Sequence, residues 1–382
     1  MKKYCGIQYE EKVDCFARTA HIKTEFLYGN LENIPNPLFT VVIPTYKRVN
    51  FLKEAIESVV NQWHAPFQWD ILVIDNEPYD GKKNETEKLI RKIDNPRILY
   101  YRNHENMRPG DNFNRGIFLA RGKWIMMLHD DDILIWNSLQ NMGRIISFLE
   151  KTSRRQVGAV NAMYFQFTYD PEYPEKYKRV ISEAQSYFTS LPTDYHVYHI
   201  THRNVLFTGH IGGDVPSNGA TFNRAAMLDI GGFNEDFGIS GDLILNYCME
   251  NKYDVYSTMV PYGLYRWGGN TMSRFESTFR TVKAGFDFRE YVYSKNLFTR
   301  IWGRLFRASQ HRGFTAFVIG QRKKSVDSKI TISDFNSIYD KKPNMHWYAF
   351  YINVVGYLYG IHKKHEMNRL FDKAMKKPDL LE

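Results

Sequence analysis

The stretch Lys123-Trp-Ile-Met-Met-Leu-His-Asp-Asp-Asp-Ile-Leu134 joins an apolar run to three consecutive acids. Residues 124–128 are apolar without alternation, which is typical of a strand buried on both faces of a parallel sheet. Asp130, Asp131 and Asp132 follow where that strand ends. Ligands of open α/β sheets bind beyond the carboxyl ends of the strands, so these acids are placed for chemistry, and a divalent cation would relieve their mutual repulsion. The alternative is a solvated acidic turn that caps the next helix.

Strands and helices alternate around this stretch. Apolar strand patterns are separated by helical patterns of about ten residues, which indicates right-handed βαβ units and a parallel sheet. We therefore expect an α/β fold. The expected strands are residues 39–43, 71–74, 98–101, 124–128 and 157–167, and the expected helices are residues 51–61, 85–93, 112–120 and 139–149.

Composition narrows the class of protein. The chain has 382 residues, of which 43% are hydrophobic, so it is globular and long enough for two domains or one large domain with an appendage. Its three cysteines are scattered without metal-like spacing, which favours a reducing compartment. We see no signal peptide and no run of 18 apolar residues, and we expect a cytoplasmic protein.

The net charge of +9 is concentrated in the last third of the chain. Residues 274–382 contain 21 Lys and Arg against 10 Asp and Glu, whereas the preceding 273 residues contain 30 and 32. Such asymmetry indicates an acidic partner, either a nucleic acid or an anionic membrane. The alternative is a packed helical cap whose basic residues are merely solvated.

Polar residues that suit a nucleotide follow each early strand. Thr45 can donate and Tyr46 can stack after the first strand, and the carboxylate of Asp75 can accept from a base N–H or a ribose hydroxyl after the second. Arg108 opens the next helix, where it can meet a phosphate. Each has a plain alternative, a turn at Asp75 and a surface charge at Arg108, but their order along one sheet edge is the stronger signal.

Glycine motifs for phosphates are missing. No G-x-G-x-x-G follows the first strand and no G-x-x-x-x-G-K-[ST] occurs, so the sequence favours neither a dehydrogenase nor a P-loop enzyme. Hard divalent cations bind carboxylate oxygens together with substrate phosphates. The strand-end acids therefore predict a metal ion that bridges a nucleotide diphosphate.

These motifs together resemble the signatures of the large family of inverting GT-A glycosyltransferases, over residues 39 to 270. The resemblance rests on an ordered set of segments: Phe39-Thr-Val-Val-Ile-Pro-Thr-Tyr-Lys-Arg48, Ser58-Val-Val-Asn-Gln62, Ile71-Leu-Val-Ile-Asp-Asn76, Asn114-Arg-Gly-Ile-Phe-Leu-Ala-Arg-Gly122, Leu128-His-Asp-Asp-Asp132 and Gly231-Gly-Phe-Asn-Glu235. It implies a GT-A type fold, a nucleotide-sugar donor that is usually a UDP-sugar, manganese or magnesium on the acids, and inversion at the anomeric carbon.

The resemblance also implies a set of site residues. The residues expected to bind the nucleotide sugar are Pro44, Thr45, Tyr46, Arg48, Asp75, Arg108, Asn114 and Asp130, and those expected to bind the metal are Asp130, Asp131 and Asp132. Two departures stand out. Asn76-Glu77-Pro78 replaces the usual acid and glycine after Asp75, and His129 stands where some members have the first acid, so which two aspartates hold the metal stays open.

The second half of the chain is less regular. Residues 168–200 lack periodicity and are expected to form an insertion or lid. Residues 207–220 are rich in glycine and could shape an acceptor pocket or form a plain connection. Residues 262–273 resemble the segment that closes over the donor, with Trp267 in place of a histidine that many members carry. In this segment Arg266, Asn270 and Ser273 are candidate diphosphate contacts.

Asp242 is the candidate catalytic base. The family usually places an acidic pair at the start of a helix, and Gly241-Asp242 retains only the second acid. A helix-capping role for Asp242 is the alternative, and Glu235 and Asp236 are competing candidates for the base.

We expect three regions: an N-terminal extension (1–38), a catalytic domain (39–273) and a basic, aromatic helical region (274–382). Within the catalytic domain, residues 39–135 form the nucleotide-sugar half and residues 136–273 the acceptor half. The expected function is glycosyl transfer to a hydroxyl of a glycan or lipid-linked acceptor, in surface polysaccharide or glycoconjugate biosynthesis, with the protein peripheral on the inner face of the cell membrane. The alternative is a non-catalytic protein that binds nucleotides or carbohydrates. We do not expect a nucleic acid as partner.

Overall fold

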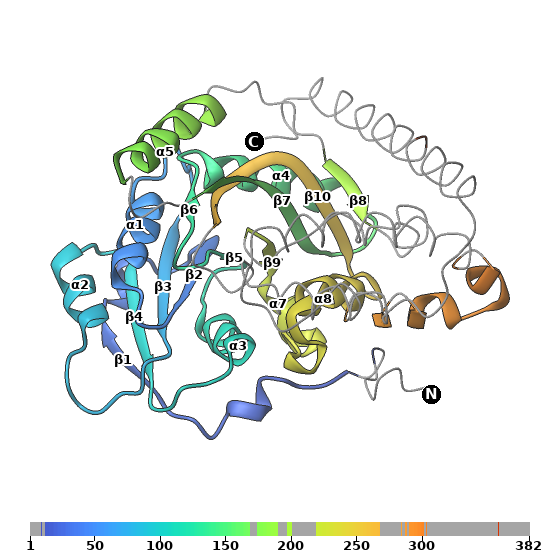
Figure 1. Ribbon diagram of the computed structural model, residues 1–382, viewed down its shortest axis with the longest axis horizontal. Helices are drawn as coiled ribbons and strands as arrows, with labels where there is room; N and C mark the ends of the chain where they lie inside the picture. The colour runs from blue at the N-terminus through green and yellow to red at the C-terminus, as the bar shows by residue number, and fades with distance from the viewer. Residues whose placement is uncertain are drawn as a thin grey trace, which may run out of the picture.

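The computed structural model describes residue 9 and residues 12–168, 174–189, 197–200, 219–267 and 290–301, with single positions at 284, 287, 288, 303 and 358. These residues form one mixed sheet with helices on both faces, and four neighbouring strands at its centre are parallel (Figure 1). The predicted α/β class with a largely parallel sheet is confirmed.

The sheet has ten strands in the order β1-β4-β3-β2-β5-β9-β7-β10-β6, and β8 pairs with β10 outside that path. Strands β4, β3, β2 and β5 are parallel to one another, as are β7 and β10, whereas β9 runs antiparallel between β5 and β7. The strands are β1 (Thr24–Tyr28), β2 (Phe39–Thr45), β3 (Trp69–Asp75), β4 (Ile98–Asn103), β5 (Trp124–Met127), β6 (Ile133–Leu134), β7 (Val157–Thr168), β8 (Val197–Ile200), β9 (Thr221–Asn223) and β10 (Asp254–Trp267).

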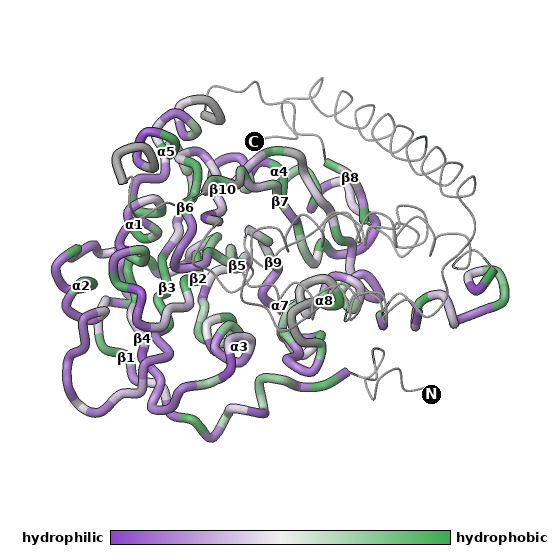
Figure 2. The backbone as a smooth tube through the Cα atoms, viewed as in Figure 1, coloured by the Kyte–Doolittle hydropathy of each residue, from purple (hydrophilic) through white to green (hydrophobic). Residues whose placement is uncertain are grey.

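Helices cover the sheet on two sides because the strand residues alternate between two apolar clusters. Phe39, Val41 and Ile43 of β2 pack with residues of α1, α2 and α4, whereas Val42 packs with residues of α3, α7 and α8. The helices are α1 (Val49–Val60), α2 (Glu85–Ile93), α3 (Pro109–Leu119), α4 (Ser138–Thr152), α5 (Pro174–Thr189), α7 (Arg224–Ile230) and α8 (Gly241–Glu250), with 3-10 turns η1 (Ala17–Thr19), η2 (Leu31–Asn33) and η3 (Glu235–Ser240). Figure 2 shows hydrophilic residues along the outer connections near α2 and β1.

Two segments differ from the sequence expectations. Residues 24–28, within the expected N-terminal extension, form β1 and pair antiparallel with β4, so they belong to the central sheet. Residues 174–189, within the expected aperiodic insertion, form helix α5, and residues 197–200 form β8. Pro174 begins α5, a position where proline costs no hydrogen bond, so the prolines around it conceal a helix.

The expected helical character of the C-terminal region is seen only in part. Residues 290–294 and 297–301 are helical, and most of residues 274–382 lie outside the described part of the chain. Phe288, Tyr291 and Val292 pack against Tyr247 of α8 in a small apolar cluster. Within the described residues, no helix combines the length and apolar character needed to span a bilayer.

Candidate functional site

The three acids lie in a buried turn at the carboxyl end of β5. Strand β5 ends at Met127, and the amide of Leu128 still donates to Val42 at 3.0 Å, so the turn begins against the end of β2. Asp130, Asp131 and Asp132 are all buried. The acidic turn is therefore not simply solvated, because its buried carboxylates accept from polar groups at the end of β2 and in β10.

Side chains from the β2 end hold the first two acids. The hydroxyl of Thr45 donates to Asp130 at 2.7 Å. The guanidinium of Arg48 donates to Asp131 at 2.8 Å and lies 3.3 Å from Asp130. The structure thus brings together four residues that the sequence predicted for this site.

His129 joins two of the acids in a group that could hold a metal ion. Ligand atoms of His129, Asp131 and Asp132 all lie within 4.8 Å of one another. Carboxylate oxygens suit magnesium and manganese, and an imidazole nitrogen adds a ligand that suits a transition metal, so the residues fit a divalent cation such as manganese. Asp131 and Asp132 belong to this group, whereas Asp130 accepts from Thr45 and Arg48 and is not part of it.

The electrostatics of the turn favour a bound cation. Burial, together with the neighbouring charge of Asp131, raises the pKa of Asp130 to about 6 and holds the pKa of Asp132 well above its usual value. Burial lowers the pKa of His129, which keeps its imidazole neutral and able to coordinate. A divalent cation at this turn would offset the repulsion that raises the carboxyl pKa values.

The sequence suggested that Arg266 contacts the donor diphosphate, but in the structure its side chain points into the protein. Its side chain is only 1% exposed, because it lies beneath the acidic turn. Its amide donates to Asp132 at 2.7 Å, and its guanidinium donates to the carbonyl of Asp131 and to Glu54, each at 2.6 Å. This arginine positions the acids, and the predicted contact with the donor phosphates is corrected.

Asn114 also has a structural contact in place of the predicted donor contact. Its buried amide accepts from the Phe233 N–H and donates to the Phe233 carbonyl, both at 2.8 Å. This pair of bonds ties α3 to the turn that follows α7. Because both ends of the amide are engaged, we leave Asn114 out of the proposed donor site.

Arg108 and Tyr46 are accessible at the same edge of the sheet. Arg108 lies at the start of α3, and its half-exposed side chain pairs with Asp111 at 2.8 Å. Tyr46 follows β2 and is 43% exposed. Pro44 is buried within β2 and serves the strand itself. Asp75 is buried at the end of β3, where it accepts from Asn84 and from Tyr100.

The acids near α8 have different surroundings. The carboxylate of Glu235 accepts from the Gly110 amide at the first turn of α3, and Asp236 pairs with Arg18 at 2.6 Å. Asp242 is the second residue of α8, as the sequence predicted, and its side chain lies outside the described residues. The structure thus assigns both competitors of Asp242 to contacts within the fold.

Several predicted residues cannot be placed. Asn270 and Ser273 lie outside the described residues, as does most of the glycine-rich segment 207–220. Conversely, sequence reasoning missed Glu54, Asn84 and Arg102, which partner the site residues. No sequence motif marks them: Glu54 joins the site through Arg266, and Asn84 and Arg102 join it through the turn that follows β3.

Part of the chain is similar to known glycosyltransferases. The model of the family described as Glycosyl transferase family 2 matches residues 40–209. An uncharacterized glycosyltransferase of Methanocaldococcus jannaschii is 38% identical over 105 residues, which are 27% of this chain and 35% of that protein. An abequosyltransferase of Salmonella typhimurium is 35% identical over 105 residues, 27% of this chain and 30% of that protein.

A further relative is the GalNAc(5)-diNAcBac-PP-undecaprenol beta-1,3-glucosyltransferase of Campylobacter jejuni, 32% identical over 107 residues, 28% of this chain and 33% of that protein. The chain spans about a third of the length of these curated relatives. Among solved structures, Staphylococcus aureus TarS has a TM-score of 0.47 at 14% identity, with 84% of this chain and 54% of that chain covered. The match to the glycosyl transferase family 2 model thus extends from β2 to beyond β8 and includes the acidic turn.

Proposed function

We propose that this chain is a metal-dependent, inverting glycosyltransferase. In this proposal it moves a sugar from a nucleotide sugar, expected to be a UDP-sugar, to a hydroxyl of a glycan or lipid-linked acceptor in surface polysaccharide or glycoconjugate biosynthesis. The observation that carries the proposal is the partly buried group of His129, Asp131 and Asp132 inside the segment that matches the family 2 model. The Campylobacter jejuni relative has an undecaprenol diphosphate in its name, which supports a lipid-linked acceptor.

The proposed reaction is a single displacement. The acceptor oxygen attacks the anomeric carbon as the bond from that carbon to the diphosphate oxygen breaks. The electron pair of that bond leaves with the nucleoside diphosphate, and the configuration at the anomeric carbon is inverted. A bound manganese or magnesium ion supplies charge neutralisation for the diphosphate. Asp131, Asp132 and His129 would hold it, Arg108 would contact a phosphate, and Asp242 would take the proton of the acceptor hydroxyl.

Metal dependence is tested at Asp131. Asp131→Asn keeps the shape of the side chain but removes a charged ligand, so manganese binding should weaken and sugar-nucleotide turnover should be nearly abolished. Binding is measured by titrating free manganese with the protein, and turnover by release of nucleoside diphosphate from a panel of nucleotide sugars. Glu85→Gln, on the exposed side of α2, is the matched control. Full turnover in excess chelator, or in Asp131→Asn, would overturn metal dependence.

The same panel separates an enzyme from a binding protein. A non-catalytic protein would bind nucleoside diphosphates but would release none from any nucleotide sugar, with or without an acceptor. That result would replace the proposed transfer with the binding function.

The base is tested by comparing three acids. Asp242→Asn should reduce turnover by about a hundredfold to ten-thousandfold with little change in donor binding, because a general base contributes that much. Glu235→Gln and Asp236→Asn should keep most of the activity, since both acids serve contacts within the fold. Normal transfer by Asp242→Asn together with loss in either other variant would move the role to that residue.

The C-terminal region supports a second part of the proposal. The surplus of basic residues in 274–382 suits attachment to an anionic membrane, where each cation near the surface contributes on the order of 1 kcal/mol. We therefore propose a cytoplasmic protein that is peripheral on the inner face of the cell membrane. Intact protein should float with vesicles that contain anionic lipid and should not float with neutral vesicles. Absence of flotation in both would remove the membrane from the proposal.

A further inference from the structure

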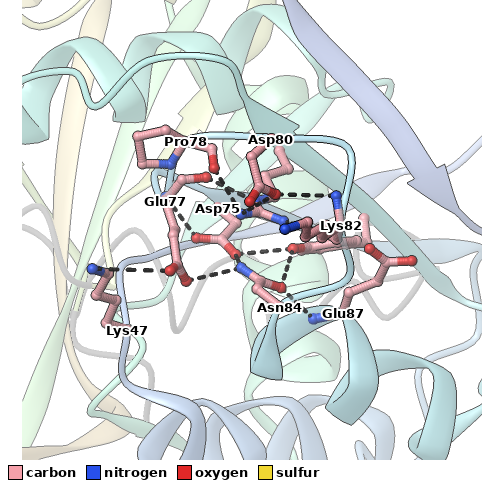
Figure 3. A network of polar contacts seen from close by, with 10 residues as sticks. Lys47, Asp75, Glu77, Pro78, Asp80, Lys82, Asn84 and Glu87 are labelled. Carbon is pink, nitrogen blue, oxygen red and sulfur yellow. Dashed lines mark hydrogen bonds and ion pairs between the residues drawn. The ribbon is translucent and has the colours of Figure 1, made fainter.

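The turn that follows β3 presents an acid next to the end of β2. Glu77 lies just beyond Asp75, and the Asn76 amide donates to the Thr45 carbonyl at 2.9 Å, so the ends of β2 and β3 stay joined. The side chain of Glu77 is 27% exposed, and one of its oxygens lies 3.9 Å from the Lys47 ammonium. Figure 3 shows Lys47 and Glu77 facing each other at one end of a polar network that includes Asp75 and Asn84.

Asp75 is turned inward and is fully engaged. One carboxylate oxygen accepts from the Glu77 amide at 2.9 Å, and the other accepts from the Asn84 side chain at 2.8 Å and the Tyr100 hydroxyl at 2.9 Å. The residue is completely buried. A nucleobase could reach this carboxylate only by breaking the network, so Asp75 supports the turn, whereas the nearby Glu77 is partly exposed.

The backbone of the turn is fixed by a buried arginine. The guanidinium of Arg102 donates to the carbonyls of Glu77, Pro78 and Lys82 at 2.8, 2.7 and 2.8 Å. Asn84 caps α2 by accepting from the Glu87 amide, and its amide also donates to Glu77 at 3.0 Å. The Glu77 carboxylate is therefore held in place before any ligand arrives, with one oxygen bonded to Asn84 and the other turned toward Lys47.

Lys47 occupies an unusual backbone position opposite this acid. Its φ is 56°, in the left-handed region that side chains other than glycine rarely adopt. Such conformations persist where the surrounding structure requires them, and they gather at ligand sites. In this conformation the ammonium lies 5.3 Å from the centre of the exposed Tyr46 ring. An aromatic face, an ammonium and a carboxylate therefore meet at one rim of the sheet.

We propose that Glu77 and Lys47 read the hydrogen-bonding edge of the donor nucleobase, with Tyr46 as the surface on which the base stacks. This inference rests on the proposed use of a nucleotide sugar and names the residues that choose its base. The carboxylate accepts from a ring N–H, and the ammonium donates to the carbonyl next to it. Uracil, thymine and guanine carry that N–H beside a carbonyl. Cytosine and adenine have an unprotonated ring nitrogen there, which a carboxylate repels.

The test is the affinity of the intact protein for UDP, GDP, CDP and ADP with manganese present, measured by calorimetry. Wild type should bind UDP or GDP at least about tenfold more tightly than CDP and ADP, because a hydrogen bond to a charged group contributes about 1.5–3 kcal/mol. Glu77→Gln should weaken UDP and GDP binding by about tenfold. The same variant should also reduce the difference in affinity between UDP and CDP, because the glutamine amide can donate to the cytosine ring nitrogen. Lys47→Met should weaken UDP and GDP binding without improving the binding of CDP.

Two controls separate base selection from folding. Glu85→Gln alters an exposed acid nearby and should leave all four affinities unchanged. Asp75→Asn should lower the melting temperature but keep the UDP to CDP ratio. The inference is overturned if Glu77→Gln keeps the wild-type ratio, or if wild type binds CDP as tightly as UDP and GDP; transfer activity in those cases leaves the proposed function standing. Failure of wild type to bind any of the four nucleotides would overturn both.

Discussion

Arg266 is a buried cation that the fold uses as a support. Its guanidinium lies 4.4 Å from the centre of the Phe51 ring and 5.4 Å from that of Phe167, and it donates to Glu54 and to the Asp131 carbonyl. Aromatic faces attract a desolvated guanidinium, so the apolar surroundings are tolerated. The acidic turn is thus supported by a buried positive charge.

Replacing this arginine should cost stability. Arg266→Met removes the hydrogen bonds to the Asp131 carbonyl and to the Glu54 carboxylate, so the free energy of unfolding should fall by about 2–4 kcal/mol. Glu54→Gln is the matched control. Because the Glu54 side chain is 38% exposed and can be hydrated, Glu54→Gln should lower the free energy of unfolding by less than about 1 kcal/mol. Denaturant unfolding of both variants measures the difference, and an Arg266→Met protein as stable as wild type would contradict the supporting role.

At the scale of elements, helix α3 packs closely on the sheet through a glycine. A Cβ on Gly116 would lie 2.5 Å from a methyl of Val42 and 3.2 Å from one of Ile74. Both neighbours belong to buried central strands, so neither side chain can move far. The close approach brings Arg108, at the start of α3, to the carboxyl edge of the sheet.

Gly116→Ala should therefore destabilise the fold even though alanine favours helices. Overpacking a core costs about 1–3 kcal/mol and the helix gains up to about 1 kcal/mol, so a net loss of about 1–2 kcal/mol is expected. Gly241→Ala in α8 is the comparison, since its Cβ would have no neighbour closer than 3.7 Å and should cost nothing. The melting temperatures of the two variants measure this difference. Equal values would mean that α3 and the sheet can move apart to accept the extra methyl group without loss of stability.

The elements of the first half could be predicted from sequence because their apolar runs are unambiguous. The expected helix at residues 85–93 has the same limits as α2, and the expected strand at 71–74 lies within β3. Strand β1 escaped prediction because Thr-Glu-Phe-Leu-Tyr at a half-buried sheet edge has no clear alternation. Helix α5 escaped because prolines near its start resemble a loop. Local pattern decides an element only where one face is fully buried.

The site was predictable only as far as strand ends determine it. The rule that parallel strands end at one edge correctly placed Thr45, Arg48 and the three acids together. It could not foresee that Arg266 turns inward or that the Asn114 amide is used by Phe233, because both depend on contacts between segments more than 100 residues apart. Whether a polar side chain faces a ligand or the protein is decided by tertiary packing.

At the scale of the whole molecule, the partly buried histidine His199 makes the stability of the fold depend on pH. His199 of β8 lies 3.3 Å from Asp254 of β10, which also accepts from Arg155 at 2.8 Å. Burial lowers the pKa of His199 below its usual 6.5 in spite of this carboxylate. The folded protein therefore holds a neutral imidazole at a pH where the unfolded chain would bind a proton.

This linkage predicts the direction of a pH effect. A lowered histidine pKa adds stability above pH 6.5, and that stability is lost as the pH falls through the folded-state value. Glutamine cannot titrate, so between pH 7 and pH 5 the unfolding free energy of wild type should fall more than that of His199→Gln. Denaturant unfolding at several pH values measures it, and a difference that stays constant would assign the acid response to other groups.

The pairing of β1 with β4 has a consequence for how the molecule behaves among its own copies. A long apolar strand left open at a sheet border is a template on which a second chain can add, and β4 would be such a border. The strand that covers it is only five residues long, follows Lys23 directly and contains Glu25, so it is itself a poor template. The segment before the first parallel strand therefore protects the molecule from aggregation, and a shortened form starting at residue 39 is expected to lose its monodispersity in solution.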